Sequence, residues 1–205
     1  MSRLGPRVKI IRRLGIQLPG LTAKDAERRP YPPGQHGQAT ARRRKVSLYR
    51  QRLEAKQAVR FHYGISENQL RRTYSMAKTR PGRTGDVMLA MLESRLDNVV
   101  FRLGFARTIP AARQLVVHGH IHVNGSRVDR PGYRLRTGDM IKLDPRMAEN
   151  PHIIEQLSRG PQVKLPGWLA KTDDTPLEGR MISPPTRESV PFAVNDAAIV
   201  EYYAR

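Results

Sequence analysis

One stretch of the chain, residues 87–103, carries apolar side chains at the spacing of an amphipathic helix. The apolar positions are Val87, Leu89, Met91, Leu92, Leu96, Val99, Val100 and Leu103. Because a helix turns once every 3.6 residues, this spacing places them on one face, which must be buried against another element. We predict one continuous helix that has Asp86 as its cap, ends at Gly104 and forms the centre of a small core.

A second, shorter helix is predicted soon after Gly104. Thr108 can cap its first turn, and Pro110 fits that turn because the first backbone N–H groups of a helix have no partner within it. Gly119 is a suitable stop. We expect residues 109–118 to form this helix and to pair with the preceding one in an arrangement that resembles a helix-turn-helix.

The segment after this helix pair has the pattern of a small β-sheet. The dipeptide Asn124-Gly125 separates the alternating segments 120–123 and 126–128. Both turn residues tolerate a positive φ, which makes this the strongest short-range signal for a β-hairpin. Residues 140–143 supply a further strand. The predicted fold class is therefore α+β and mainly helical.

Two more helices are predicted before residue 87. Ser47 can cap the first of them, which Gly64 would end, and Ser66 with Gln69 forms a capping box at the start of the second. Two helices joined this tightly should pack together. The face of the first helix opposite its apolar side carries Arg50, Arg52, Lys56 and Arg60.

The two ends of the chain are predicted to hold little regular structure. Residues 1–45 combine dense Arg with Pro and Gly, show no helical or strand period and cannot bury a core alone. We expect this arm to become ordered only against a partner. After Arg146 the chain is poorly periodic, and residues 199–203 are interpreted as a short strand or a tail packed on another element.

Positive charge gathers in two parts of the chain. The formal net charge is +19, and residues 1–60 carry 16 basic and 3 acidic side chains. Residues 101–147 carry 9 basic and 3 acidic side chains, whereas residues 148–205 carry 6 basic and 8 acidic ones. An excess of this size needs a polyanionic partner. We therefore predict two parts that bind a polyanion and an acidic C-terminal quarter that meets protein.

Several kinds of protein are excluded by what the chain lacks. It has no cysteine, so it forms neither disulfides nor thiolate metal sites, which fits a reducing cytosol. No apolar run approaches the roughly 20 residues of a membrane helix, so we expect no membrane association. His120 and His122 share one strand face near His118, yet no further ligand has a convincing spacing. No metal, cofactor or small-molecule substrate is predicted.

A series of ordered motifs covers nearly the whole chain. They are Pro33-Gly34-Gln35-His36-Gly37, residues 52–57 (RLEAKQ), residues 92–104 (LESRLDNVVFRLG), residues 112–116 (ARQLV), His118-Gly119-His120-Ile121 and residues 199–205 (IVEYYAR). With these motifs the chain resembles the family of bacterial small-subunit ribosomal protein four. Residues 11–15, 60–64 and 108–110 resemble the cyanobacterial and plastid branch of that family. The cysteine knuckle of some relatives is absent, which removes zinc.

The resemblance implies a helical domain with an inserted RNA-binding module, the alpha-L motif, after which the chain returns to the helical part. We assign residues 1–46 to a basic N-terminal arm, residues 47–94 with 180–205 to the helical domain, and residues 95–179 to the module and a following linker. The resemblance also implies a structural, non-catalytic protein that binds 16S rRNA, nucleates assembly of the small subunit and influences decoding accuracy. Further implied partners are ribosomal protein five of the small subunit and messenger RNA, whose structure the chain would help to unwind. The implied location is the small ribosomal subunit, in the cytoplasm or in a plastid stroma.

The predicted binding residues follow from their charge and hydrogen-bonding capacity together with the resemblance. Phosphate contacts supply affinity without base specificity, and polar side chains at a helix end or hairpin can bond sugar hydroxyls. The residues predicted to bind rRNA are Arg3, Arg7, Lys9, Arg12, Arg13, Gln35, His36, Arg52, Lys56, Arg60, Arg95, Arg102, Arg107, Arg113, Gln114, His118, His120 and Asn124. Those predicted to form a basic patch where messenger RNA enters the subunit are Arg42, Arg43, Arg44 and Lys45. Asp97 is left out, because an acid among arginines more often orients Arg95 or Arg102 than contacts RNA.

Three other functions stay open as alternatives. A free-standing RNA regulator that represses its own message would be found mainly off ribosomes in a sucrose gradient. An RNA-modifying enzyme with the same module would append a catalytic domain, whereas here Asp173 and Asp174 have no nucleophile, general base or phosphate cradle beside them. A DNA-binding helix-turn-helix protein would prefer duplex DNA over folded RNA in direct competition.

Overall fold

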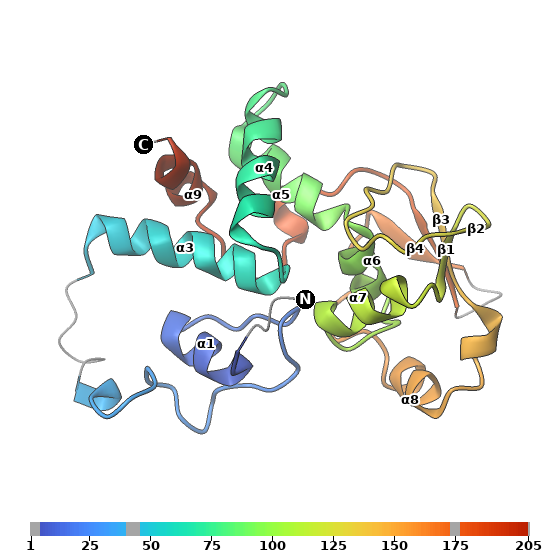
Figure 1. Ribbon diagram of the computed structural model, residues 1–205, viewed down its shortest axis with the longest axis horizontal. Coiled ribbons are helices and arrows are strands. Elements are labelled where there is room, and N and C mark those ends of the chain that lie inside the picture. The colour runs from blue at the N-terminus through green and yellow to red at the C-terminus, as the bar shows by residue number, and fades with distance from the viewer. Residues whose placement is uncertain (1–4, 40–45, 173–176, 205) are drawn as a thin grey trace. The chain divides into compact units, whose positions relative to one another are not determined.

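The computed structural model describes residues 5–39, 46–172 and 177–204, and the chain divides into two compact units (Figure 1). Unit 1 joins Met1–Met88 with Pro191–Arg205, and unit 2 consists of Leu89–Val190. Unit 1 is therefore built from segments that are far apart in the sequence, whereas unit 2 is continuous. Among the helices of the described residues, none has the length and apolar character needed to cross a membrane.

Unit 1 is helical and begins two of its helices where the sequence predicts. Helix α3 spans Leu48–His62, and the Ser47 side chain accepts a hydrogen bond from the backbone N–H of Arg50. Helix α4 spans Glu67–Lys78 and starts with the predicted capping box of Ser66 and Gln69. Both caps satisfy backbone N–H groups that the first helical turn leaves without a partner.

The basic arm contains a helix that the sequence analysis missed. Helix α1 spans Arg7–Leu14, and its residues Ile10 and Ile11 are buried together with Leu18 and Leu21. The expectation of no helical period in the arm is wrong for this segment. Four apolar side chains among four basic ones, within only eight residues, are too few to establish a period. They are enough to fix one face of a helix of two turns.

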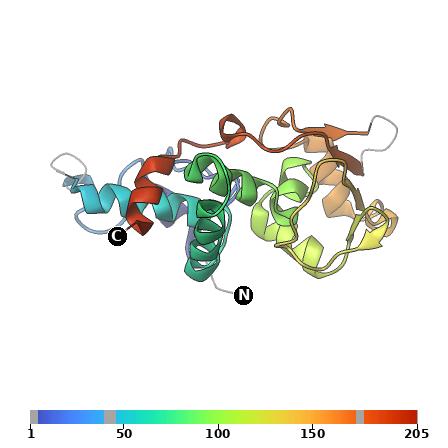
Figure 2. The same ribbon diagram turned by 90° about the horizontal axis from the view of Figure 1, so that it is seen from above.

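The C-terminal segment is a helix and not the predicted strand or tail. Helix α9 spans Asp196–Tyr203, and the Asn195 side chain caps it by accepting from the N–H of Ala198 at 3.0 Å. It packs along α3, as both views show (Figures 1 and 2), and the ring of Tyr203 stacks on Tyr74 with 5.0 Å between centroids. The β-branched and aromatic residues favour a strand locally, but packing on α3 and α4 overrides that preference.

The apolar stretch 87–103 forms two helices and not one. Helix α5 spans Thr84–Glu93, so Asp86 lies in its first turn and is not its cap, and α6 spans Leu96–Arg102. Between them Arg95 is extended, with φ −69° and ψ 141°, and pairs with Arg134 in a β-bridge. The helix breaks because the loop 131–135 supplies other partners for its backbone. The N–H groups of Leu96 and Asp97 bond to carbonyls of this loop at 2.8 and 3.1 Å.

Unit 2 combines three helices with a small sheet. Helix α7 spans Ile109–Val117 and is capped by Thr108 as predicted, and α8 spans Pro151–Arg159. The single-turn 3-10 helices η1 (Pro145–Met147) and η2 (Arg187–Ser189) complete the helical elements of this unit's described residues. The sequence analysis did not predict α8, whose apolar side consists of few residues.

The sheet is antiparallel, with the strand order β2-β1-β3-β5-β4. Its strands are β1 (Ile121–Val123), β2 (Ser126–Arg127), β3 (Met140–Leu143), β4 (Leu169–Lys171) and β5 (Glu178–Met181). The predicted hairpin is confirmed: Asn124 and Gly125 both have positive φ, 50° and 80°, as a type I′ turn requires. Leu103 lies directly over Gly179 in β5, where a Cβ would come within 2.5 Å of its Cδ2. The fold class α+β, mainly helical, is confirmed.

Candidate nucleic-acid interface

Two arginines of unit 2 are held by one buried carboxylate. The Nε and Nη2 atoms of Arg95 bond to the two oxygens of Asp97 at 3.0 and 2.9 Å, and Nη2 of Arg113 bonds to Oδ2 at 2.7 Å. The Asp97 side chain is 1% exposed, whereas Arg95 and Arg113 keep 12% and 20% of their side-chain surfaces. Asp97 therefore orients Arg95, as predicted. Its second arginine is Arg113 and not Arg102.

Arg102 does not lie on a basic surface, and the prediction that it presents its charge to RNA is wrong. Its guanidinium bonds to Glu93 Oε2 at 2.8 Å and to the carbonyl of Ser189 at 2.6 Å, and the residue is 1% exposed. Every residue of α6 is buried, so position 102 lies in the core whatever its side chain. A charge in that position needs a buried partner, which Glu93 provides.

The end of α7 and the start of the hairpin bring together several of the predicted polar residues. Gln114 is exposed on α7 and His118 is exposed directly after its last residue, and the rings of His118 and His120 lie 6.1 Å apart. Arg107 is exposed just before α7. Exposed donors and acceptors of this kind can bond phosphates and sugar hydroxyls.

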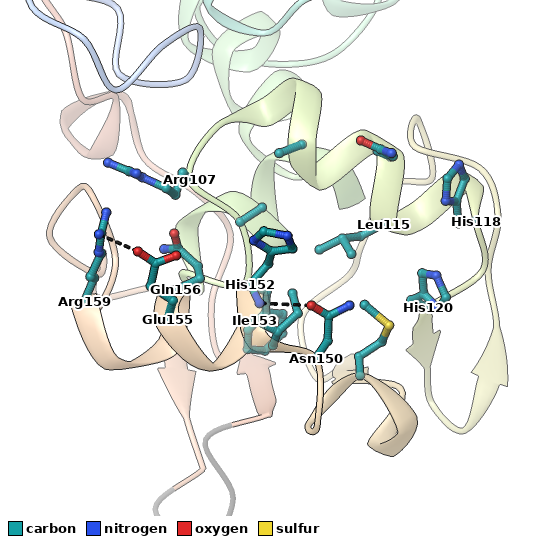
Figure 3. Close-up of a pocket in the computed structure, with 15 residues that line it drawn as sticks. Arg107, Leu115, His118, His120, Asn150, His152, Ile153, Glu155, Gln156 and Arg159 are labelled. Carbon is teal, nitrogen blue, oxygen red and sulfur yellow. Dashed lines mark hydrogen bonds and ion pairs between the residues drawn. The ribbon is translucent and has the colours of Figure 1, made fainter.

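These residues also border a pocket of about 720 Å³ between α7 and α8 (Figure 3). Its lining includes Arg107, Gln114, His118 and His120 of the predicted set. The far wall comes from α8, where His152 and Gln156 line the pocket. The sequence analysis missed this wall because it did not predict α8.

Asn124 has a role within the fold. Its Nδ2 donates to Asp139 Oδ1 and its Oδ1 accepts from the N–H of Met140, both at 2.9 Å. These bonds tie the hairpin turn to the start of β3. One N–H donor and one lone pair of the exposed amide are thus used on the protein, so the fold fixes the orientation of this side chain.

In unit 1, the residues of α1 differ in how free their charges are. Arg7 and Lys9 are exposed, whereas Arg12 donates through Nε to the carbonyls of Arg29 and Tyr31, both at 3.0 Å. Arg13 is exposed and donates to Gln57 Oε1 of α3 at 2.8 Å. Arg12 therefore holds the loop that follows α1 and Arg13 contacts α3, whereas Arg7 and Lys9 are exposed.

The predicted residues of α3 mainly hold α9 and α4. Arg52 pairs with Glu201 at 2.7 Å, and the Lys56 ammonium lies 3.1 Å from Glu67 and 4.3 Å from the ring centre of Tyr202. Lys56 is 6% exposed, so the prediction that it lies on a binding surface is wrong. Arg60 is half-buried beside the ring of Phe61. Burial against Glu67 raises the pKa of Tyr203 in the same cluster above its ordinary value.

The remaining predicted residues lie in the arm. Gln35 and His36 are exposed in a tight turn, where a Cβ on Gly37 would collide with the carbonyl of Pro32. Arg3 and the patch of Arg42, Arg43, Arg44 and Lys45 lie outside the described residues. Within the described ranges, no three His, Asp or Glu side chains are grouped so as to hold a metal ion.

Sequence reasoning missed several exposed cations. Arg71 and Arg72 lie on the outer face of α4, next to a hollow that Asn68, Ser75 and Met76 also line. The signal was available, because these positions alternate with Leu70, Tyr74 and Ala77, which α4 buries. In unit 2 the exposed residues Arg127, Arg130 and Arg136 follow the hairpin turn.

The comparisons with known proteins cover the whole chain. Residues 2–93 match the family described as ribosomal protein S4/S9 N-terminal domain, and residues 94–141 match the S4 domain. The small ribosomal subunit protein uS4 of Synechococcus elongatus is 50% identical over 206 residues, which cover 100% of this chain and 99% of that protein. The uS4 of Methylobacillus flagellatus is 47% identical over 205 residues, with 100% and 98% covered, and the uS4c of Cyanophora paradoxa is 48% identical over 206 residues, with both chains fully covered. The chain therefore belongs to the uS4 family of small ribosomal subunit proteins.

Proposed function

We propose that the chain is a structural, non-enzymatic component of the small ribosomal subunit that binds its 16S rRNA through basic surfaces on both units. The observation that carries this proposal is the pair of arginines fixed on Asp97, of which Arg113 lies on α7. The exposed residues Gln114 and His118 lie on the same helix and directly after it. Folded RNA is recognised mainly through phosphates and 2′-hydroxyls, and a preformed array of donors suits that task. Membership of a ribosomal protein family supports the same role.

In this mechanism the two fixed arginines give shape recognition and the free cations give affinity. Arg95 and Arg113 lose little side-chain entropy on binding, because Asp97 already holds them. Exposed cations such as Arg7, Lys9 and Arg107 neutralise phosphates and release counterions, which makes affinity depend on salt. The chain has no need to react with its ligand, only to hold it.

The finer functions concern assembly and translation. A chain with basic surfaces on two separately folded units can hold two RNA segments at once, which supports nucleation of subunit assembly and an influence on decoding accuracy. The dense basic run at residues 42–45 supports a contact that helps to unwind messenger RNA. The mildly acidic C-terminal quarter supports a contact with ribosomal protein five.

The test is a salt titration of full-length protein against the isolated 5′ domain of 16S rRNA. One variant replaces Arg7, Lys9 and Arg13 with Gln, and a second replaces Arg107 and His118 with Gln. Each lost phosphate contact should lower the slope of log affinity against log salt by about 0.7 to 0.9. Lys164→Gln with Arg180→Gln removes two exposed charges outside the predicted surfaces and is the matched control. Unchanged affinity and slope in both test variants would reject the proposal.

A further inference from the structure

We propose that the pocket between α7 and α8 receives one unpaired base of the bound RNA. The inference rests on the proposed function, because the base would be presented by rRNA already bound to unit 2. It adds a site of base contact to a surface that otherwise contacts backbone. The lining, one buried acceptor and the charge at the mouth support it.

The pocket has the size and walls of a site for a flat aromatic group. Its volume of about 720 Å³ lies within the usual range of roughly 300 to 1,000 Å³ for small-ligand sites. Leu115, Met147 and Ile153 supply apolar surface. Base faces are apolar and stack or pack on such surfaces, whereas phosphates and sugars do not. The lining therefore fits a base better than a backbone segment.

Gln156, one of the residues that line the pocket, carries a buried side-chain acceptor that has no partner among the described residues. Gln156 is 6% exposed, and its Nε2 donates to the carbonyls of Gly104 and Gly160, both at 3.3 Å. Those two bonds fix which end of the amide is the nitrogen, so the unpartnered atom is Oε1. Buried acceptors are normally bonded. An N–H on the Watson–Crick edge of an unpaired base supplies the missing donor.

The charge around the mouth suits a nucleotide whose phosphates stay outside. Arg159 is paired with Glu155 of the same helix at 2.5 Å, so it contributes little net charge. Arg107 is exposed at the edge of the pocket, where it can reach a flanking phosphate. Figure 3 shows the ring of His152 between the two helices, where a stacked base would meet it. A free dianion would instead need several buried cations, which the described lining does not provide.

The pocket opens on the surface that the proposed function assigns to RNA. Gln114, His118 and His120 belong both to that surface and to the lining. An RNA strand that bonds these side chains passes the mouth, and a base turned out of its stack has a short way into the pocket. Unpaired bases in loops and bulges are the usual targets of sequence-specific RNA recognition.

The experiment is chemical probing of the isolated 5′ domain of 16S rRNA bound to full-length protein. Dimethyl sulfate reports the Watson–Crick edges of A and C, and a carbodiimide reports those of G and U. Leu115→Trp fills the pocket, Gln156→Met removes the acceptor, and Val117→Trp adds the same bulk on the exposed side of α7 as a control. Thermal unfolding by circular dichroism checks that each variant is folded.

We expect at least one unpaired base that is protected by the wild type and by Val117→Trp but reactive with both pocket variants. Affinity should fall about tenfold with Leu115→Trp or Gln156→Met, because a base N–H loses its buried partner. The salt slope should stay unchanged, since no phosphate contact is lost. A normal wild-type footprint in which neither folded pocket variant exposes a base would overturn this inference alone. Absence of any wild-type footprint would overturn the proposed function with it.

Discussion

Arg102 and Glu93 form an ion pair inside unit 2, with Nη2 and Oε2 2.8 Å apart and side chains that are 1% and 0% exposed. The pair joins α6 to the end of α5, across the break at Arg95. Asn98 donates to the same carboxylate oxygen at 3.0 Å. The two helices that the sequence presents as one are thus held together by charge at their junction.

Removal of one partner of this pair should destabilise unit 2 strongly. Arg102→Met leaves the Glu93 carboxylate buried without its cation, which costs about 3 to 5 kcal/mol. Urea unfolding followed by circular dichroism measures the change. Combining Arg102→Met with Glu93→Leu should recover part of the loss, because no buried charge is left. A single variant that loses less than about 1 kcal/mol would contradict a structural role for the pair.

Asp97→Asn should weaken binding to the cognate RNA although it makes the chain more positive. The carboxylate holds Arg95 and Arg113, so the substitution removes an ion pair from each guanidinium group. We expect about a tenfold loss of affinity for the 5′ domain of 16S rRNA, because the two arginine side chains then lose conformational entropy when they bind RNA. Filter binding against an unrelated RNA of equal length should show no loss. Asp129→Asn, at an exposed position, is the control for charge alone.

Asn124→Ala should affect folding more than RNA binding. Ala lacks the two side-chain bonds to the start of β3, and the φ of 50° at this position is unfavourable for a residue other than Gly or Asn. We expect a loss of about 1 to 2 kcal/mol in the free energy of unfolding. RNA affinity measured well below the melting temperature should stay within about twofold of wild type. A large loss of affinity with unchanged stability would instead make Asn124 an RNA ligand.

Tyr203→Phe should lower stability at neutral pH and change its response to alkali. Burial, and the hydrogen bond that Tyr203 donates to Glu67 at 2.8 Å, raise the pKa of the phenol above 10. The folded state therefore keeps a proton that the unfolded chain loses above pH 10, so this stabilisation is full below pH 10 and declines as pH rises beyond it. The free energy of unfolding of the wild type should exceed that of the variant by about 1 kcal/mol near neutral pH, and this difference should shrink in alkali. Urea unfolding of both proteins at about pH 8 and pH 11 measures it.

Local chemistry explains which elements could be predicted from the sequence. The caps at Ser47, Ser66 and Thr108 and the Asn124-Gly125 turn act within a few residues, and all are present. The break at Arg95 depends on carbonyls of residues 131 and 133, which no local pattern reveals. For the same reason α9 was missed, since its helical form depends on α3 and α4.

The predicted site shows the same division. Basic character could be read along the chain, and exposed residues such as Arg7 and Arg107 agree with it. Which cation is free and which is paired within the fold could not be predicted, because ion pairs join distant positions. Arg52, for example, pairs with Glu201, which lies 149 residues further along the chain. Cations predicted to bind RNA, Lys56 and Arg102, are buried with carboxylates.

The discontinuity of unit 1 sets an order of events during synthesis. Residues 89–190 emerge as one stretch and can fold as soon as they are complete. Helices α3 and α4 are made earlier, yet Arg52 of α3 cannot pair with Glu201, nor Tyr74 of α4 stack on Tyr203, before α9 is made. A nascent chain that has reached residue 190 would thus contain all residues of unit 2, while the side of α3 that α9 later buries is still exposed.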